Sequence, residues 1–269
     1  MRIVEAPSDD SWARDHAPIT VYEGAETVLL DFEFNGWGGK YPSANDNRLS
    51  RTLQVKGAYG STRMRGVDYV LEGGSIESDG KGTILTTAQC VLTPARNADL
   101  TKEKVAEVFR KEFGAVRVLW LHHGQLAGDD TDGHVDTLAR FCDERTIAYT
   151  GCDEPGDEHF ADLERMADEL ASFRTIDGRS YRLVKLPMPS PCYDSGGMRL
   201  PATYANFLIV NGAVLLPTYA DEENDGRAMQ ALQTCFPDRA IVGIDCRSLI
   251  LQHGSLHCAT MHFPRGVEL

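Results

Sequence analysis

Four stretches of the chain place apolar runs on either side of a short polar turn, a pattern that predicts antiparallel hairpins. The clearest covers 206–217, NFLIVNGAVLLP, where Asn211-Gly212 predicts a type I′ turn between two strands. The other three cover 18–32, 75–87 and 135–150. The chain is therefore expected to form four hairpins at rather even intervals.

Helical spacing of apolar residues follows three of these hairpins. Helices are expected within 99–113, 158–173 and 222–236. After each helix comes one more apolar strand, at 115–121, 181–188 and 240–246. The repeating unit is therefore strand, strand, helix, strand, and it recurs along nearly the whole chain.

Polar residues that could carry out chemistry recur at one position of this repeat. Asp15 and Glu72 are 57 residues apart, Glu72 and His134 are 62 apart, and His134 and Cys258 are 124 apart, which is twice 62. The skipped position falls at Gly196. A roughly fivefold array of such units, each with the same edge facing one axis, would bring these distant residues together.

Composition narrows the class of protein. With 269 residues, 42% of them hydrophobic and 25% charged, the chain has average globular usage and can bury a large core. No window approaches ~18 apolar residues, and the N-terminus lacks a signal-peptide pattern, so we expect no membrane segment. Seven scattered cysteines without a C-x-x-C pair suggest neither a disulfide framework nor a cysteine zinc site. A reducing cytoplasm fits best.

The net charge of −13 opposes a nucleic-acid partner, which would need a basic surface. A small cationic substrate is easier to accommodate. Alternatively, the acidic residues only keep the protein dissolved. Net charge alone therefore does not identify the substrate.

Cys258 has two interpretations. An isolated cysteine is usually a small buried hydrophobe. Its place at the repeat phase, after Gly254, favours a nucleophile instead. A free thiol has a pKa of roughly 8.5, so a reactive thiolate needs a nearby cation. His257 or a cationic substrate could provide that charge.

His134 and Asp136 are two residues apart in GHVD. If the segment is a strand, both side chains project to one face. His134 would then transfer protons, and Asp136 would grip a planar cation through paired hydrogen bonds. The alternative is an ordinary exposed pair at a strand entrance.

Asp15 in SWARDHAP and Glu72 in LEGGS also have two interpretations. Each is either a solvated turn or strand-end residue or a carboxylate of a cation site, and the glycines after Glu72 could let a substrate approach the backbone. Trp37 in NGWGGKYP either covers a substrate or fills a core gap. At the skipped phase, Asp194 would suit an amine terminus of the substrate and Arg199 a carboxylate.

Five motifs together resemble one family. WARDHAP, NGWGGKYP, LEGGSI, TDGHVDTLARF and GSLHCATMHFP are similar, in this order, to motifs of the agmatine deiminase and bacterial-type peptidylarginine deiminase family within the guanidine-modifying superfamily. The resemblance covers essentially the whole chain. It implies one catalytic domain over 1–269 with a fivefold pseudosymmetric α/β propeller fold, incomplete at its N-terminal unit.

The resemblance also implies a chemistry without metal or organic cofactor. Cys258 would attack a guanidinium carbon, and His134 would act as general acid and base. Asp15 and Asp136 would bind guanidinium nitrogens, and Glu72 would support the histidine and substrate. Ammonia leaves first, and a covalent thiouronium is then hydrolysed to a ureido product.

Agmatine, giving N-carbamoylputrescine in polyamine biosynthesis, is the expected substrate, with arginine and peptidylarginine as alternatives. Two rival functions stay open. A metal-dependent hydrolase would use the dense His and Asp set over 122–136. A non-catalytic guanidine-binding module would retain the motifs without turnover. The sequence leaves the oligomeric state undecided.

Overall fold

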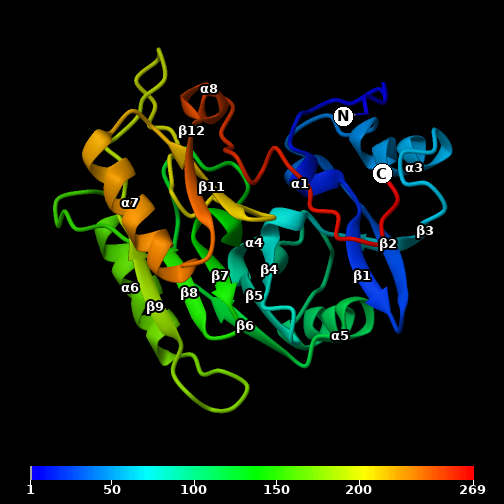
Figure 1. Ribbon diagram of the computed structural model, residues 1–269, viewed down its shortest axis with the longest axis horizontal. Helices are drawn as coiled ribbons and strands as arrows, with labels where there is room; N and C mark the ends of the chain where they lie inside the picture. The colour runs from blue at the N-terminus through cyan, green and yellow to red at the C-terminus, as the bar shows by residue number, and fades with distance from the viewer. Residues whose placement is uncertain (1) are drawn as a thin grey trace. The chain divides into compact units, whose positions relative to one another are not determined.

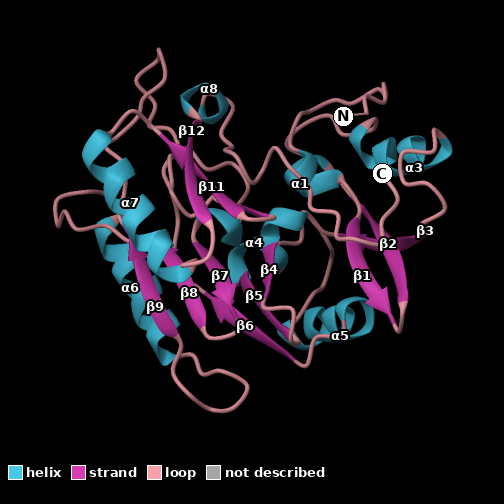
Figure 2. Cartoon of the chain, viewed as in Figure 1, coloured by secondary structure: helices cyan, strands magenta, loops and turns pink. Residues whose placement is uncertain are grey.

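The computed structural model describes residues 2–269, which form two compact units. The first unit holds the residues up to Gly73, Leu92–Lys102 and Cys258–Leu269, and the second holds Gly74–Val91 and Glu103–His257. Both combine short β-sheets with helices, so the chain has a mixed α/β fold (Figures 1 and 2).

The first unit contains one three-stranded sheet in the order β1-β2-β3. β1 (Ile19–Glu23) and β2 (Glu26–Glu33) pair antiparallel, and β2 pairs parallel with β3 (Arg63–Val70). A parallel neighbour requires a crossover connection. The crossover contains α3 (Asp46–Val55), and the short helices α1 (Ala13–His16) and α2 (Gly36–Gly39) flank the hairpin in sequence.

The second unit contains three sheets of the same design. In each, the first two strands pair antiparallel and the third pairs parallel with the middle one. The sheets are β4 (Ile76–Ser78), β5 (Thr83–Thr87) and β6 (Arg117–Leu121); β7 (Ala139–Asp143), β8 (Thr146–Thr150) and β9 (Arg182–Leu186); and β10 (Leu208–Val210), β11 (Ala213–Thr218) and β12 (Ala240–Asp245).

One long helix provides the crossover in each of these sheets. They are α5 (Lys102–Phe113), α6 (Phe160–Ser172) and α7 (Glu222–Cys235). α6 contacts β6 of the preceding sheet, and α7 contacts both β9 and β12, so α6 and α7 each lie against the preceding sheet (Figure 1). Shorter helices are α4 (Ala88–Val91), α8 (Arg247–Ile250) and the 3₁₀ turns η1 (Gly73–Ser75) and η2 (Val135–Thr137).

The core of the second unit lies under these helices. Leu163, Met166 and Leu170 form the apolar face of α6 and pack with Phe141 and Ile147 of the β7-β8 hairpin. A second cluster joins the buried face of α7 to the β10-β11 hairpin. Burial of these faces, at roughly 25 cal/mol per Å² of apolar surface, holds each helix to its sheets.

The predicted hairpins, the three long helices and the strands after them are confirmed, to within a few residues at their ends. The predicted type I′ turn is wrong. Gly212 has φ +77°, but Asn211 is absent from the residues with positive φ, whereas a type I′ turn needs positive φ at both central positions.

The sequence pattern missed α3, which completes the same repeating unit in the first sheet. Its buried positions are polar: Asp46 and Ser50 are each only 1% exposed. Asp46 accepts hydrogen bonds from the backbone of Asp9 and Asp10, and the Ser50 hydroxyl donates to the His16 carbonyl. Because hydrogen bonds replace apolar contacts on this face, the helix has no apolar stripe to detect.

Two expectations from composition concern the whole described chain. All seven cysteines are free thiols, as their scatter predicted. Among residues 2–269, every helix is too short or too polar to cross a lipid bilayer.

The glycine at 73 makes a close backbone approach possible in the first unit. A Cβ atom at Gly73 would lie 2.2 Å from the carbonyl oxygen of Arg14, which is far inside van der Waals contact. Only glycine can occupy this position without moving one of the two segments. Gly73 therefore fixes the LEGG turn against α1.

We expect Gly73→Ala to destabilise the protein by about 2 kcal/mol or more, because backbone atoms must separate to admit the methyl group. Gly226→Ala is the matched control, since Gly226 lies within α7 with open space around it, and alanine there should stabilise by about 0.5–1 kcal/mol. Urea unfolding measures both changes. Equal midpoints for Gly73→Ala and the wild type would contradict this account.

Candidate active site

The first unit brings together three of the predicted site residues. Gly73, next to Glu72, packs on the backbone of Arg14, next to Asp15. The backbone N–H of Arg14 donates to the carbonyl of Cys258 at 3.0 Å. Asp15, Glu72 and Cys258 therefore sit on three backbone segments that meet at α1, although they are far apart in sequence.

Arg14 secures the segment that carries Cys258. Its guanidinium nitrogens lie 3.3 Å from the Met261 sulfur and 3.3 Å from Nδ1 of His262, beyond the cysteine. Arg14 is 7% exposed and Cys258 is 6% exposed, and the contacts with Met261 and His262 are partly buried. Arg14 belongs to the WARD motif, but nothing in the sequence pattern singles it out.

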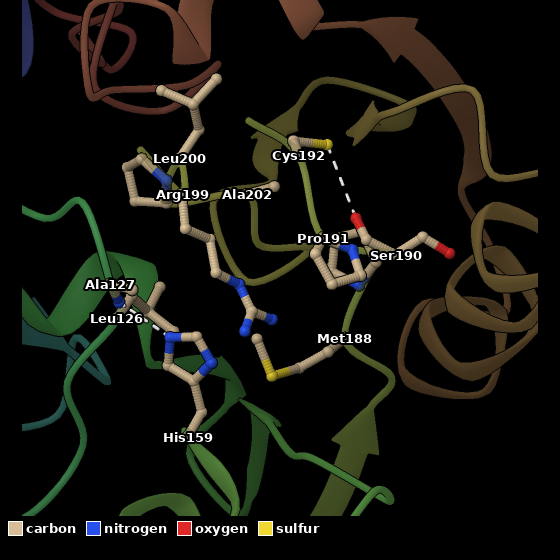
Figure 3. A pocket seen from close by; sticks show the side chains of 12 residues that line it. Leu126, Ala127, His159, Met188, Ser190, Pro191, Cys192, Arg199, Leu200 and Ala202 are labelled. Atoms are coloured by element: carbon tan, nitrogen blue, oxygen red, sulfur yellow. Dashed lines mark hydrogen bonds between the residues drawn. The ribbon is translucent and has the colours of Figure 1, made fainter. Parts of the chain in front are cut away.

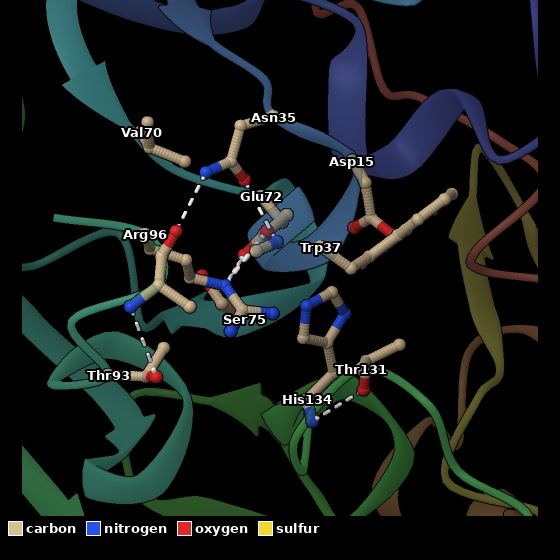
Figure 4. Close-up of polar contacts among 12 residues, drawn as sticks. Asp15, Asn35, Trp37, Val70, Glu72, Ser75, Thr93, Arg96, Thr131 and His134 are labelled. Carbon is tan, nitrogen blue, oxygen red and sulfur yellow. Dashed lines mark hydrogen bonds and ion pairs between the residues drawn. The ribbon is translucent and has the colours of Figure 1, made fainter. Parts of the chain in front are cut away.

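Asp15 receives a hydrogen bond from an indole. The Nε1–H of Trp37 donates to Oδ2 of Asp15 at 3.0 Å, and both side chains are buried (Figure 4). Trp37 has the left-handed conformation φ 55°, ψ 48°, which costs of order 1–3 kcal/mol for a non-glycine residue. Asn35 holds this turn by accepting from the backbone N–H of Gly38 and donating to the carbonyl of Ala95.

Glu72 lies against an arginine. The Nε–H of Arg96 lies 2.6 Å and 2.9 Å from the two carboxylate oxygens of Glu72, and both side chains are almost fully buried (Figure 4). A buried carboxylate stays ionised when a buried cation compensates it. Sequence reasoning missed Arg96, because TPARNAD carries no motif that distinguishes it from a surface arginine.

The second unit holds His134 and Asp136, and here the predicted local structure is wrong. They lie at η2, with His134 as its N-cap residue, and β7 starts only at Ala139. The Thr131 hydroxyl accepts from the His134 N–H, and the Thr137 hydroxyl donates to the His134 carbonyl. These local side-chain bonds compete with strand pairing and favour the turn. Both predicted residues are 0% exposed, so neither is an exposed surface residue.

Asp136 lies beside His257. Nδ1 of His257 is 2.7 Å from Oδ2 of Asp136, and the pair is buried. Asn206 joins the two segments, because its Oδ1 accepts from the His257 N–H at 2.8 Å and its amide lies 3.4 Å from the Asp136 carbonyl oxygen. One peptide bond then links His257 to Cys258.

Three other cysteines have raised thiol pKa values. Burial raises the pKa of Cys152, Cys192 and Cys246 above its ordinary value, so these thiols stay protonated near neutral pH. A protonated thiol is a poor nucleophile. The environments of these three thiols thus suit packing rather than nucleophilic attack.

Arg199 and Asp194 have structural partners at the surface of the second unit. Arg199 donates to Asp157 at 2.8 Å and to Glu158 at 3.1 Å. Burial alone would raise the pKa of Asp157, but hydrogen bonds from Arg199 and His159 lower it to about 2. Asp194 accepts from the N–H groups of Gly196 and Met198 and so closes its own loop.

Arg199 and the neighbouring His159, Met188 and Cys192 line a small hollow in this unit (Figure 3). For Arg199 to bind a substrate carboxylate, it would have to leave two acidic partners. Asp194 would likewise have to release two backbone N–H groups to bind an amine. The geometry therefore assigns both side chains to holding the 192–204 segment.

Within the His and Asp set over 122–136, His122, His123 and Asp129 are used for local structure. His122 pairs with Glu169 and His123 with Asp162, both carboxylates of α6, each with 3.0 Å between nitrogen and oxygen. Asp129 accepts from Thr131 and Gly133 and closes the loop before His134. These side chains are directed to different partners, which does not favour a shared metal site.

Comparison with known proteins identifies the relatives of the chain. Residues 1–264 match the Porphyromonas-type peptidyl-arginine deiminase family. A putative agmatine deiminase of Vibrio parahaemolyticus is 37% identical over 98% of this chain and 78% of its own length. The agmatine deiminase of Ectopseudomonas mendocina is 33% identical over 98% of this chain and 77% of its own length.

Solved structures agree with these relatives. A putative arginine deiminase from Porphyromonas gingivalis is 50% identical, with a TM-score of 0.94 over 98% of this chain and 78% of its own. A cysteine-to-serine variant of C. jejuni agmatine deiminase, with substrate bound, is 38% identical, with a TM-score of 0.90 over 95% of this chain and 74% of its own. On this evidence the chain belongs to the Porphyromonas-type peptidyl-arginine deiminase family.

Proposed function

We propose that this protein is a cysteine-dependent deiminase that hydrolyses agmatine to N-carbamoylputrescine and ammonia. Membership of the family supports a hydrolase acting on a carbon–nitrogen bond. The observation that carries the assignment to Cys258 is its backbone attachment to α1, which supplies Asp15. We also propose that the four sheets are units of the fivefold propeller expected from the sequence repeat.

In the first half of the reaction, the Cys258 thiolate attacks the guanidinium carbon of the substrate. A tetrahedral adduct forms, and His134 donates a proton to the departing nitrogen, which leaves as ammonia. The carbon is then bound to sulfur as a thiouronium. Splitting the hydrolysis into two steps lowers each barrier, as in other covalent mechanisms.

In the second half, His134 removes a proton from water, whose oxygen attacks the thiouronium carbon. The carbon–sulfur bond breaks, and the electron pair returns to Cys258 as the thiolate. The ureido product leaves with the oxygen of water, and the proton that remains on this oxygen is released to solvent. The balance is one agmatine and one water consumed, and one N-carbamoylputrescine and one ammonia formed.

Asp15 and Asp136 would bind the guanidinium nitrogens, and Glu72 would support the substrate and the histidine. A guanidinium donates in a planar fork that matches a carboxylate. Fixing its carbon close to sulfur offsets much of the barrier through orientation. The same cation favours the thiolate form of Cys258, so substrate binding and nucleophile activation are linked.

Agmatine is preferred over arginine for one structural reason. An arginine substrate would bring an α-carboxylate, and Arg199, the cation considered for that role, already pairs with Asp157 and Glu158. Peptidylarginine stays an alternative because the family name includes it. The partner we propose is therefore a small cationic guanidine, handled in the cytoplasm without nucleic acid or membrane.

The substrate order can be measured directly. We expect ureido formation with kcat/KM highest for agmatine, lower for free arginine and lowest for arginine-containing peptides. A colorimetric ureido assay with all three substrates at equal concentration measures this order. Turnover confined to peptidylarginine would overturn the choice of agmatine.

The nucleophile assignment makes a second prediction. Cys258→Ser should lower kcat by about 10⁴-fold or more, because a hydroxyl is a far weaker nucleophile without its own base. Cys152→Ser is the control, since the Cys152 thiol only donates to the Glu154 carbonyl and a hydroxyl can do the same. Activity that survives in Cys258→Ser but disappears with a chelator would instead favour metal-dependent hydrolysis.

The contact between Trp37 and Asp15 distinguishes the two roles considered for this tryptophan. Trp37→Phe keeps an aromatic ring beside Phe34 and Tyr41 but removes the N–H that binds Asp15. We expect KM for agmatine to rise about tenfold, the effect of one charge-assisted hydrogen bond. Steady-state kinetics of Trp37→Phe test this, and Trp120→Phe, a substitution on β6, is measured as the control. A lower melting temperature with unchanged KM would show that Trp37 only fills the core.

A further inference from the structure

A buried arginine in the second unit connects three sheets near Asp136. Arg140, on β7, is 3% exposed. Its Nε–H donates to Oε2 of Glu77 on β4 at 2.7 Å, and its Nη1 donates to the Phe207 carbonyl at 2.8 Å. The guanidinium also lies 4.9 Å from the centre of the Phe207 ring. These contacts fix the orientation of the guanidinium and leave Nη2 directed at another group.

That group is the imidazole of His257. Nη2 of Arg140 is 3.1 Å from Nε2 of His257. An arginine nitrogen only donates and keeps its charge at any relevant pH. Nε2 must therefore be the acceptor and carry no proton, which makes His257 neutral with its proton on Nδ1. A protonated imidazole would turn a second N–H toward the arginine and bring two positive charges together.

The tautomer determines what Asp136 receives. The Nδ1–H of His257 points at Oδ2 of Asp136 over 2.7 Å, so it donates to the carboxylate. A carboxylate can accept about four hydrogen bonds, so this bond alone does not saturate it. The His257 backbone is held as well, because its N–H donates to Oδ1 of Asn206.

We propose that Glu77, Arg140 and His257 form a relay that positions Asp136 for guanidinium binding and anchors the segment carrying Cys258. The relay rests on the proposed function, in which Asp136 binds substrate. His257 is then a neutral positioning residue. This differs from the sequence-based suggestion that His257 supplies a cation to the Cys258 thiolate.

The relay keeps the Asp136 carboxylate ionised and fixes its orientation. Without Arg140, Nε2 of His257 could take up a proton. The resulting imidazolium would pair with Asp136 and compete with the substrate cation for the same carboxylate. Asp136 from η2 and Arg140 from β7 both face His257, and Glu77 balances the charge of Arg140.

The tautomer can be observed without any turnover. In ¹⁵N-histidine-labelled Cys258→Ser protein, the His257 signals, assigned with His257→Asn, should show a protonated Nδ1 and an unprotonated Nε2 unchanged from pH 6 to pH 9. In Arg140→Met, we expect His257 to titrate within this range. A protonated Nε2 in the Cys258→Ser protein would overturn the relay.

Binding tests the role of the relay in substrate recognition. In the Cys258→Ser background, Arg140→Met should raise the agmatine dissociation constant, measured by calorimetry, by about tenfold or more. Arg117→Met is the matched control, because Arg117 is likewise an arginine on a strand that donates to other segments, here to the hydroxyls of Thr83 and Tyr181, without reaching Asp136. Adding Asp136→Asn should abolish the effect of Arg140→Met, and independent, additive effects would overturn the proposal.

A second pair of variants keeps the test valid if Arg140→Met does not fold. His257→Asn can still donate an amide N–H to Asp136, whereas His257→Leu cannot. We expect His257→Asn to bind agmatine within about threefold of the parent and His257→Leu at least about tenfold more weakly. Equal weakening by both would contradict the relay. If wild-type enzyme fails to turn over agmatine, the proposed function falls, while the tautomer result stands independently.

Discussion

A buried carboxylate stays charged only when donors beside it replace the water it has lost. An unpaired buried charge costs several kcal/mol, and removing one partner of such a pair typically costs about 3–5 kcal/mol. A donor of this kind lies beside each carboxylate of the candidate site: Trp37 for Asp15, Arg96 for Glu72 and His257 for Asp136. The donors come from three different types of group, an indole, a guanidinium and a neutral imidazole.

These donors need supports of their own, and that need explains features with no catalytic group. The strained Trp37 turn is tied down by Asn35. Gly73 lacks a side chain because the Arg14 backbone occupies the space. Arg140 keeps His257 in one tautomer. The residues around the site are therefore constrained in type and position, as the site residues are.

The strand-strand-helix-strand repeat places the candidate site residues in connecting segments that are equivalent from one repeat to the next. Strand pairing uses the backbone donors of the sheets, and the crossover helices cover them with apolar faces. The turns that connect one unit to the next are therefore free to carry polar side chains. Such connecting segments supply Asp15, on α1, together with Glu72, His134 and Cys258.

Much of the fold follows from local pattern, because period 2 and period 3.6 record which faces are buried. The same reasoning missed α3, whose buried face consists of Asp46 and Ser50. It also placed His134 on a strand, because the hydroxyls that form the η2 turn leave no periodic signal. The five motifs indicated Cys258, His134 and the carboxylates. Arg96 and Asn206 could not be found, because a donor that acts through a distant partner looks like any polar residue in sequence.

The central claim is that Cys258 becomes covalently attached to the guanidinium carbon. Intact mass spectrometry after rapid acid quenching of enzyme with agmatine tests it most directly, with peptide mapping to locate the adduct. We predict a transient species heavier than the free enzyme by agmatine minus ammonia, carried by the peptide that contains Cys258. Ureido product formed with no adduct at any quench time, or with the adduct on another cysteine, would contradict the account.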